Sequence, residues 1–213
     1  MLFNYLKIFT AIYFHTELDM IRKVSEERKS VEKEQLNPNV ISYWAESIDD
    51  ENGFSWQVTV ASTQKGLCWV GLGKPEQEEE ILKAKIKRWN PQTVLIRRRS
   101  PNEKVLAELG EYFAGNRKEF TIPLDSIGTP FQLRVWEELR KIPYGETRNY
   151  GEIAREIGNP KGQRAVGLAN NKNPIGIIVP CHRVIGKSGA LVGYAGGVDL
   201  KERLLKLEAH KKS

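Results

Sequence analysis

Two short helical segments that meet at a sharp turn are the feature that most restricts how this chain can fold. Asn149 is typical of a helix N-cap, and it predicts a helix over 150–157. Residues 161–171 predict a second helix. Gly-Asn-Pro at 158–160 separates the two, and this composition is typical of a tight turn. We therefore expect a helix-turn-helix, a motif that often binds DNA.

The composition of the second predicted helix admits two explanations. Four of its positions hold glycine or alanine, at Gly162, Ala165, Gly167 and Ala169. Because glycine in a helix interior costs about 1 kcal/mol relative to alanine, the two glycines need a reason. One reason is close packing against another helix. The other is close approach to a nucleic-acid backbone, with Arg164 reaching into a groove.

A cysteine and a histidine follow an apolar run that ends at a proline. Residues 177–179 predict a buried strand, and Pro180 predicts its end because proline fixes φ and lacks an N–H donor. Cys181 would then lie at the rim of the strand beside His182, as a thiol nucleophile is presented with a base. The alternative is that Cys181 is a small buried apolar residue. Next to a predicted DNA-binding helix, the pair favours a nucleophile that acts on DNA.

The net charge of +6 comes entirely from the C-terminal part of the 213-residue chain. Residues 1–124 hold 18 basic and 18 acidic side chains, whereas 125–213 hold 15 basic and 9 acidic ones. A basic excess in the segment that contains Cys181 favours a polyanionic partner, most often nucleic acid. On charge alone, an ordinary solvated surface remains the alternative.

The cysteines and histidines exclude two classes of site. Cys68 and Cys181 provide no disulfide framework, which fits a reducing compartment. Together with His15, His182 and His210 they show no zinc-ligand spacing, so we expect no structural metal. Cys68 lies in an apolar run, and we expect it in the core.

Residues 1–41 are expected to form an N-terminal extension that is partly disordered. The apolar cluster at 2–14 is too short and too interrupted for a membrane span. It also lacks the basic start and the small-residue cleavage site of a signal peptide. Residues 20–36 are charge-dense, as in a solvated helix or a disordered lead-in.

Residues 42–124 have the pattern of a small α/β domain. Apolar runs predict strands over 54–62, 66–72, 94–96 and 120–124, with a hairpin turn at 64–66. Helical spacing predicts helices over 75–89 and 102–114. The segment contains no catalytic cluster, and we interpret it as a scaffold domain.

Residues 125–213 are expected to form a second, mostly helical domain. After a turn-rich link at 125–128, Thr129 and Pro130 are typical of an N-cap and a first helical position. A largely buried helix is predicted to run from there to Ile142.

Five motifs in a fixed order give the chain a resemblance to a known family. They are Pro-Tyr-Gly-Glu-Thr at 143–147, Arg-Ala-Val at 164–166, Asn-Pro at 173–174, Pro-Cys-His-Arg-Val at 180–184 and Tyr-Ala-Gly-Gly at 194–197. From about Val58 to Glu208 the sequence resembles the O6-alkylguanine-DNA alkyltransferases, also called methylated-DNA–protein-cysteine methyltransferases. The resemblance implies an α+β fold. A small RNase H-like N-terminal α/β domain would precede a mostly helical, winged-helix-like domain that carries the helix-turn-helix.

The resemblance also implies a reaction. The family transfers the alkyl group from O6 of guanine, and less readily from O4 of thymine, to a cysteine after flipping the base out from the minor groove. It implies a single-turnover methyltransferase for DNA repair that needs no cofactor. The implied partner is double-stranded DNA with alkylated bases. The protein is expected to act as a monomer and to have no membrane partner. The implied location is the cytoplasm, at the nucleoid in a prokaryote.

The roles of individual residues carry over from the family at matching positions. Cys181 resembles the alkyl acceptor, His182 its water-linked base, and Glu208 the carboxylate that orients the histidine. Asn173 resembles the hinge asparagine of this network. Tyr150 resembles the residue that rotates the 3′ phosphate and assists base extrusion. Alkyltransferase-like proteins replace the cysteine, so Cys181 argues against that class.

Binding residues are implied in the same way. Tyr194 resembles the pocket tyrosine, and the backbone of Cys181 and Val184 the acceptors for the guanine amine. Ala195 stands where some relatives have serine: alanine keeps a contact made through the backbone N–H at this position, whereas a contact made by the serine hydroxyl is absent. Arg164 resembles the finger that fills the vacated stack. The residues implied to contact DNA are Arg164, Tyr150, Lys161, Gln163, Ala165 and Arg183.

Two other functions remain alternatives. A cysteine hydrolase could use Cys181, His182 and Glu208, but it would need an oxyanion hole and access for water to an acyl-enzyme. A helix-turn-helix regulator would need a dimer and base-reading side chains, whereas the second predicted helix offers mainly small residues.

Overall fold

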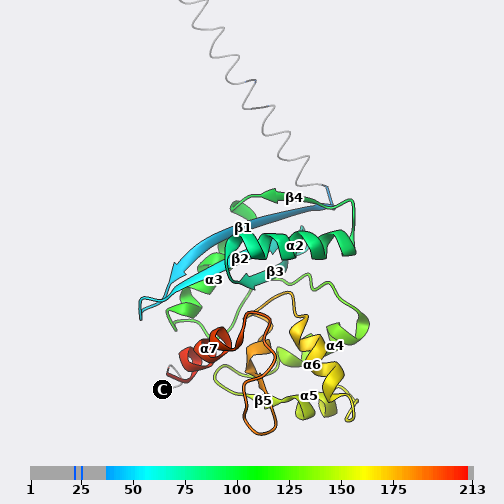
Figure 1. Cartoon of the computed structure of the whole chain (residues 1–213). Coiled ribbons are helices and arrows are strands. Elements are labelled where there is room, and N and C mark those ends of the chain that lie inside the picture. The colour runs from blue at the N-terminus through cyan, green and yellow to red at the C-terminus, as the bar shows by residue number, and fades with distance from the viewer. Residues whose placement is uncertain (1–21, 23–24, 26–36, 211–213) are drawn as a thin grey trace, which may run out of the picture.

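The computed structural model describes Arg22, Ser25 and residues 37–210, and the elements from β1 to α7 form two layers (Figure 1). A sheet with helices on its faces forms the N-terminal layer, and a group of helices packs beneath it. The expectations for residues 1–36 lie outside the described part, apart from two positions. None of the helices in the described ranges is long and apolar enough to cross a membrane.

The N-terminal sheet has the strand order β3-β2-β1-β4. Its strands are β1 Val40–Asp49, β2 Ser55–Ser62, β3 Leu67–Leu72 and β4 Val94–Arg97. The first three pair antiparallel and β4 runs parallel to β1. The strands expected at 54–62, 66–72 and 94–96 are present, as is the hairpin turn, where Thr63 N–H bonds to Gly66 O. The long strand β1 was not predicted.

Two helices cover opposite faces of the sheet. The helix α2, Pro75–Trp89, has the predicted bounds and buries Leu82 and Ile86 against one face. Cys68 lies in this cluster with no exposed surface, as expected. The helix α3, Glu103–Phe113, lies on the other face, where the Phe113 ring stacks on Trp56 with 4.5 Å between centroids.

The strand expected at 120–124 is absent, and a side chain explains the difference. Leu124 forms only an isolated bridge with Leu67. The backbone N–H of Thr121 bonds at 2.9 Å to the Glu108 carboxylate, and the Thr121 hydroxyl bonds to the same group. A carboxylate of α3 therefore takes the place of a neighbouring strand in this segment.

The C-terminal layer holds four helices and a small two-stranded sheet. The helices are α4 Pro130–Leu139, α5 Tyr150–Glu156, α6 Gln163–Asn171 and α7 Val198–His210, and the strands are β5 Arg148–Asn149 and β6 Val184–Ile185. The predicted N-caps of α4 and α5 are confirmed as capping boxes at Thr129 and Asn149. The helix α4 ends at Leu139, short of the predicted Ile142, and α7 was not predicted.

The predicted strand over 177–179 is wrong. These residues form turns, and Ile177 has a φ of 67°, which a strand excludes. Just before this run, around Ile175, the chain pairs with the edge of β3: Val70 N–H bonds to Pro174 O at 2.9 Å and Gly176 N–H to Val70 O at 3.0 Å. The run is apolar because it lies between the two layers. A buried turn segment and a buried strand have the same apolar pattern, so the sequence could not distinguish them.

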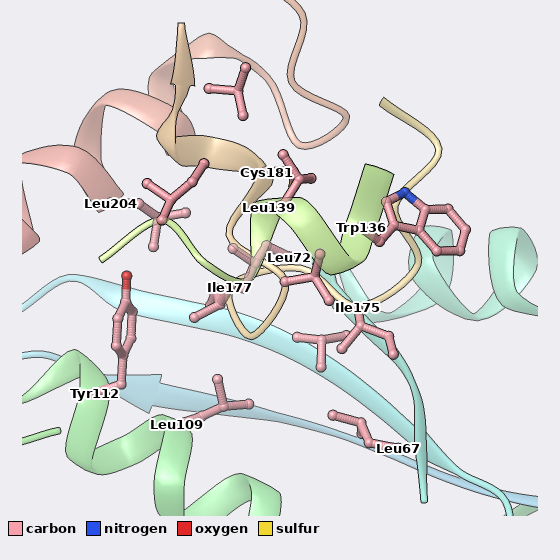
Figure 2. Close-up of a cluster of buried hydrophobic side chains, with 14 of the residues drawn as sticks. Leu67, Leu72, Leu109, Tyr112, Trp136, Leu139, Ile175, Ile177, Cys181 and Leu204 are labelled. Atoms are coloured by element: carbon pink, nitrogen blue, oxygen red, sulfur yellow. The ribbon is translucent and has the colours of Figure 1, made fainter. Parts of the chain in front are cut away.

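The two layers share one hydrophobic core. Leu67 and Leu109 from the upper layer and Trp136, Ile175 and Leu204 from the lower layer belong to the same buried cluster (Figure 2). Cys181 and Tyr112 belong to this cluster as well. The expected fold class, a mixed sheet domain followed by a helical domain, is confirmed, and the layers are packed so that both reach the cysteine.

Candidate functional site

Cys181 opens a tight 3-10 turn, Cys181–Arg183, that follows Pro180. Its side chain is buried, with 6% of the residue exposed, and burial raises the pKa of the thiol. The side chain of Asn173 and the charge of Lys201 act in the opposite direction on this pKa. The thiol therefore needs a base to become a nucleophile. The next residue in the turn, His182, is the candidate for that base.

His182 is the base that the geometry provides. It has no exposed surface, and its Nε2 lies 2.8 Å from Glu208 Oε1. Burial lowers the pKa of His182 more than the Glu208 carboxylate raises it, so the ring is neutral. With an ionised carboxylate at Nε2, the ring proton belongs on that nitrogen. The other nitrogen, Nδ1, is buried without a hydrogen-bond partner among the described residues, and its lone pair can take a proton.

Glu208 is held by donors from several segments. Arg183 Nε lies 3.0 Å from Oε2 and Nη2 2.9 Å from Oε1, while Gly145 N–H donates to Oε2 at 3.1 Å. Burial by itself would raise the pKa of Glu208, but the hydrogen bonds and charges of His182 and Arg183 outweigh it and hold this pKa well below its usual value. Cys181, His182 and Glu208 are called the relay below.

The expectation that Arg183 contacts DNA is corrected by its position. Only 6% of the residue is exposed, and its guanidinium bonds to Glu208 and to Ile142 O at 2.7 Å. A buried arginine in a bidentate pair with a carboxylate has a partner already and does not reach a phosphate. The same basic residue that the motif places after the histidine therefore serves the relay.

Asn173 ties the turn of the cysteine to the end of α6. Its side-chain amide donates to Val179 O at 2.8 Å and to Ile175 O at 3.3 Å, and its oxygen accepts from Ile175 N–H at 3.0 Å. The Asn173 side chain also forms a hydrogen bond with the Cys181 thiol, which lowers the pKa of the thiol. Asn173 therefore holds the backbone of the segment that leads into Cys181.

Lys201 is a residue of the site that the sequence did not single out. It has no exposed surface, and its Nζ donates to Val184 O at 2.5 Å and to Val192 O at 2.9 Å. Burial lowers the pKa of Lys201. The sequence did contain a signal for the burial of Lys201: it has helical spacing with Leu204 and Glu208. In the structure all three residues lie on one face of α7 and are buried. Lys201 thus occupies one lone pair of the Val184 carbonyl that was expected to bind a base.

The two tyrosines that the resemblance implied both lie close enough to Cys181 for its charge to act on them. Tyr194 is partly buried, and burial, followed by the charges of Cys181 and Glu78, raises its pKa well above the usual value. Tyr150 begins α5, its hydroxyl donates to Val192 O at 3.1 Å, and burial together with Cys181 raises its pKa. Ala195, next to Tyr194, is exposed. Both tyrosines are therefore protonated and can donate a hydrogen bond.

The two glycines of the second helix have different explanations. A Cβ at Gly162 would lie 2.2 Å from Asn159 Nδ2, so the tight turn itself requires glycine there. A Cβ at Gly167 would meet only the Tyr150 ring, at 3.8 Å, which is an ordinary contact. Packing within the chain therefore explains Gly162, whereas Gly167 leaves room on the outer face of α6 that the described residues do not fill.

Four of the residues that the resemblance implied for DNA contact lie on the outer face of α6 and in the turn before it. Lys161, Gln163 and Arg164 are exposed and Ala165 is partly exposed. Leu168, one turn after Arg164 on the same face, is 65% exposed, and it was not predicted. In the described part of the chain no group of three or more His, Cys, Asp or Glu side chains could hold a metal ion.

Two family models match the chain. The model of the 6-O-methylguanine DNA methyltransferase ribonuclease-like domain matches residues 54–126, and the model of the DNA binding domain of the same methyltransferase matches 130–210. A methylated-DNA–protein-cysteine methyltransferase from Methanosarcina acetivorans is 50% identical over 151 residues, which are 71% of this chain and 90% of the relative. The inducible methylated-DNA–protein-cysteine methyltransferase of Bacillus subtilis is 45% identical over 74% of this chain and 87% of its own length.

A solved structure is similar over most of its length. The crystal structure of Mycobacterium tuberculosis OGT in complex with DNA superposes with a TM-score of 0.64 at 42% sequence identity. The match covers 80% of this chain and 94% of the Mycobacterium tuberculosis chain. The similarity therefore extends over both layers described above.

Proposed function

The chain belongs to the family of 6-O-methylguanine DNA methyltransferases, and on that premise we propose that it repairs DNA by moving an alkyl group from O6 of guanine to Cys181. Methyl transfer from DNA to a protein cysteine is the reaction in the names of its relatives. The observation that carries the proposal is the relay, in which a buried thiol adjoins a neutral histidine whose Nε2 is held by a buried carboxylate.

The proposed transfer begins with deprotonation of the thiol. An alkyl ether carbon is a weak electrophile, so the attacking group has to be a thiolate. The Cys181 proton passes through a water to His182 Nδ1, and Glu208 stabilises the imidazolium that results. The sulfur then bonds to the alkyl carbon as the carbon–O6 bond breaks, and the bonding electrons leave on the guanine. Tyr150, which stays protonated, exchanges its hydrogen bond to Val192 O for one to the guanine anion.

The base has to leave the duplex before it reaches the buried sulfur. Flipping a base out of the stack costs a few kcal/mol. We assign Arg164 to fill the vacated position, because it is exposed on the outer face of α6. Tyr150 would rotate the 3′ phosphate. Tyr194, the backbone N–H of Ala195 and the carbonyls of Cys181 and Val184 would form the pocket for the flipped base.

Docking on DNA is proposed through the minor groove and the outer face of α6. Lys161, Gln163 and Ala165 are assigned to backbone contacts, which position the protein without reading sequence. The partner would be duplex DNA with O6-alkylguanine or, less readily, O4-alkylthymine. We propose a monomer that consists of an extension at 1–41, a scaffold domain at 42–124 and a reactive domain at 125–213. A cytoplasmic site of action, at the nucleoid in a prokaryote, would match a DNA substrate.

The proposed reaction is stoichiometric. Alkylated Cys181 is a thioether, and it has no carbonyl for water to attack. The other described cysteine, Cys68, is buried on the far face of the sheet, where burial raises its pKa to about 12, so it cannot take the alkyl group over. Each chain should therefore accept one alkyl group.

Mass spectrometry tests the proposal. The protein is mixed with an excess of duplex DNA containing O6-methylguanine, and we expect one added methyl on the peptide of Cys181. Cys181→Ala should add none, and the matched variant Cys68→Ala should add one. Methyl transfer that survives in Cys181→Ala, or label that passes beyond one equivalent, would contradict the assignment.

A further inference from the structure

Glu208 receives a hydrogen bond from the layer that was interpreted as a scaffold. The hydroxyl of Tyr112, on α3, donates to Glu208 Oε1 at 2.7 Å. The two residues are 96 positions apart, and neither has any exposed surface. In Figure 2 the Tyr112 ring rises from α3 with its hydroxyl pointing toward the lower layer, on the side of Leu204 of α7. A residue of the upper layer therefore contacts the relay directly.

The hydrogen bond falls on the oxygen that matters for the base. Glu208 Oε1 is the atom that faces His182 Nε2 at 2.8 Å, whereas Gly145 N–H donates to Oε2 at 3.1 Å. Arg183 Nε is shared between the two oxygens, at 3.0 Å from Oε2 and 3.2 Å from Oε1. Arg183 Nη2 also bonds to Oε1, at 2.9 Å. Besides His182 itself, Tyr112 is the neutral side chain among these described donors, so it orients Oε1 without adding a second positive charge beside the imidazole.

The direction of this hydrogen bond is determined by chemistry. Burial and the neighbouring Glu208 charge raise the pKa of Tyr112 well above its usual value, so its oxygen keeps the proton and donates. Glu208 is ionised and only accepts. An Oε1 that only accepts requires an N–H at His182 Nε2, and this tautomer leaves Nδ1 free as the base.

The ring and the hydroxyl of Tyr112 have separate roles. The ring lies 5.6 Å from those of Phe113 and Phe120 and 6.0 Å from that of Tyr144, which is ordinary aromatic packing. Only the hydroxyl reaches Glu208. Substitution by phenylalanine therefore removes the hydrogen bond and leaves the packing in place.

We propose that Tyr112 is a positioning residue for alkyl transfer, whose hydroxyl holds Glu208 Oε1 against His182 so that Nδ1 acts as the base. The proposal rests on the function of the relay proposed above and extends the site to α3. The titratable and charged groups that face Glu208 and His182 come from four segments. They are Tyr112 of α3, Tyr144 before β5, Arg183 of the 3-10 turn, and Lys201 of α7.

The test compares Tyr112→Phe with Tyr43→Phe in the full chain. Tyr43 is a matched control, because it is also a buried tyrosine of the upper layer and its hydroxyl interacts with a glutamate, Glu79, in the other core cluster. The rate of benzyl transfer from free O6-benzylguanine to the protein is measured against pH. This substrate needs no flipping, so its rate reports on the chemistry alone.

We expect Tyr112→Phe to react about tenfold more slowly, the factor of one hydrogen bond to a charged group. The acid limb of its pH–rate profile should move to higher pH, since Oε1 then gives more of its charge to His182 and raises the pKa of the imidazole. Tyr43→Phe should match the wild type in both measurements. Duplex DNA binding should be unchanged in both variants.

A double-mutant cycle with Glu208→Gln separates the two proposals. If Tyr112 acts through Glu208, adding Tyr112→Phe to Glu208→Gln should produce no further loss of rate. A normal rate and pH profile in Tyr112→Phe, together with a slow Glu208→Gln, would overturn the role of Tyr112 alone. A Glu208→Gln variant as fast as the wild type would overturn the relay itself. A lower melting temperature with an unshifted profile would make Tyr112 merely structural, which also overturns the proposal.

Discussion

Alkylation of Cys181 should destabilise the protein, and the structure sets the size of the effect. The sulfur lies in a turn whose residues are held by hydrogen bonds and by burial, so they cannot easily move away from it. Cys181 N–H bonds to Val179 O at 2.8 Å, its carbonyl accepts from Asn170 at 3.3 Å, and Val184 beside it has no exposed surface. With only 6% of Cys181 exposed, an added methyl group has to displace packed neighbours.

The magnitude follows from the chemistry of overpacking. One additional methyl group in a packed site typically costs about 1–3 kcal/mol. For a chain of this size, 1 kcal/mol lowers the melting temperature by roughly 2–4 °C. We therefore expect protein with a methylated Cys181 to melt roughly 2–12 °C below fresh protein.

The assay is a thermal melt of fresh and fully methylated protein after the DNA has been removed. Mass spectrometry verifies complete methylation, and limited proteolysis reports whether the lower layer has loosened. Cys181→Ala carried through the same incubation controls for handling, and its melting temperature should not change. Fully methylated protein that melts at or above the temperature of fresh protein would refute the reasoning from packing.

Three further predictions test other parts of the molecule. Arg164→Ala should slow repair of duplex DNA by about tenfold or more, with little effect on free O6-benzylguanine, because only the duplex needs base extrusion; equal slowing of both would move Arg164 into the reaction site. Leu168→Ala should weaken duplex binding without changing its dependence on salt, since leucine releases no counterions, whereas Ile81→Ala, on α2, should leave binding unchanged. The pKa of Glu208 is lower in the folded state than in the unfolded chain, so the ionised carboxylate stabilises the fold fully above the unfolded pKa of about 4.3. This stabilisation is lost as the pH falls toward the folded pKa. The free energy of unfolding, measured with denaturant, should therefore depend less on acid pH in Glu208→Gln than in the wild type.

Local signals predicted the parts of the fold that depend on neighbours in sequence. The bounds of α2 follow from Pro75 and the apolar spacing after it, and the capping boxes at Thr129 and Asn149 mark the starts of α4 and α5. Gly-Asn-Pro at 158–160 predicted the turn between α5 and α6, whereas Gly162, expected inside the second helix, is its N-cap. The motif around Cys181 pointed to Cys181 and His182, and the family resemblance added Glu208, which lies 2.8 Å from His182. Each of these depends on residues a few positions apart or on a pattern read as a whole.

Contacts between distant segments decided the rest. Residues 177–179 are apolar because two layers close over them, so they look like a strand and fold as turns. Arg183 could face DNA or the interior, and only the position of Glu208 on α7, 25 residues later, turns it inward. Tyr112 lies in a helix without any chemical motif, and the role proposed for it depends on its hydrogen bond to Glu208, 96 positions later in the chain. A sequence determines which side chains are available, whereas burial brings distant ones together and sets their charges, because only the packed core removes the water that would otherwise separate them.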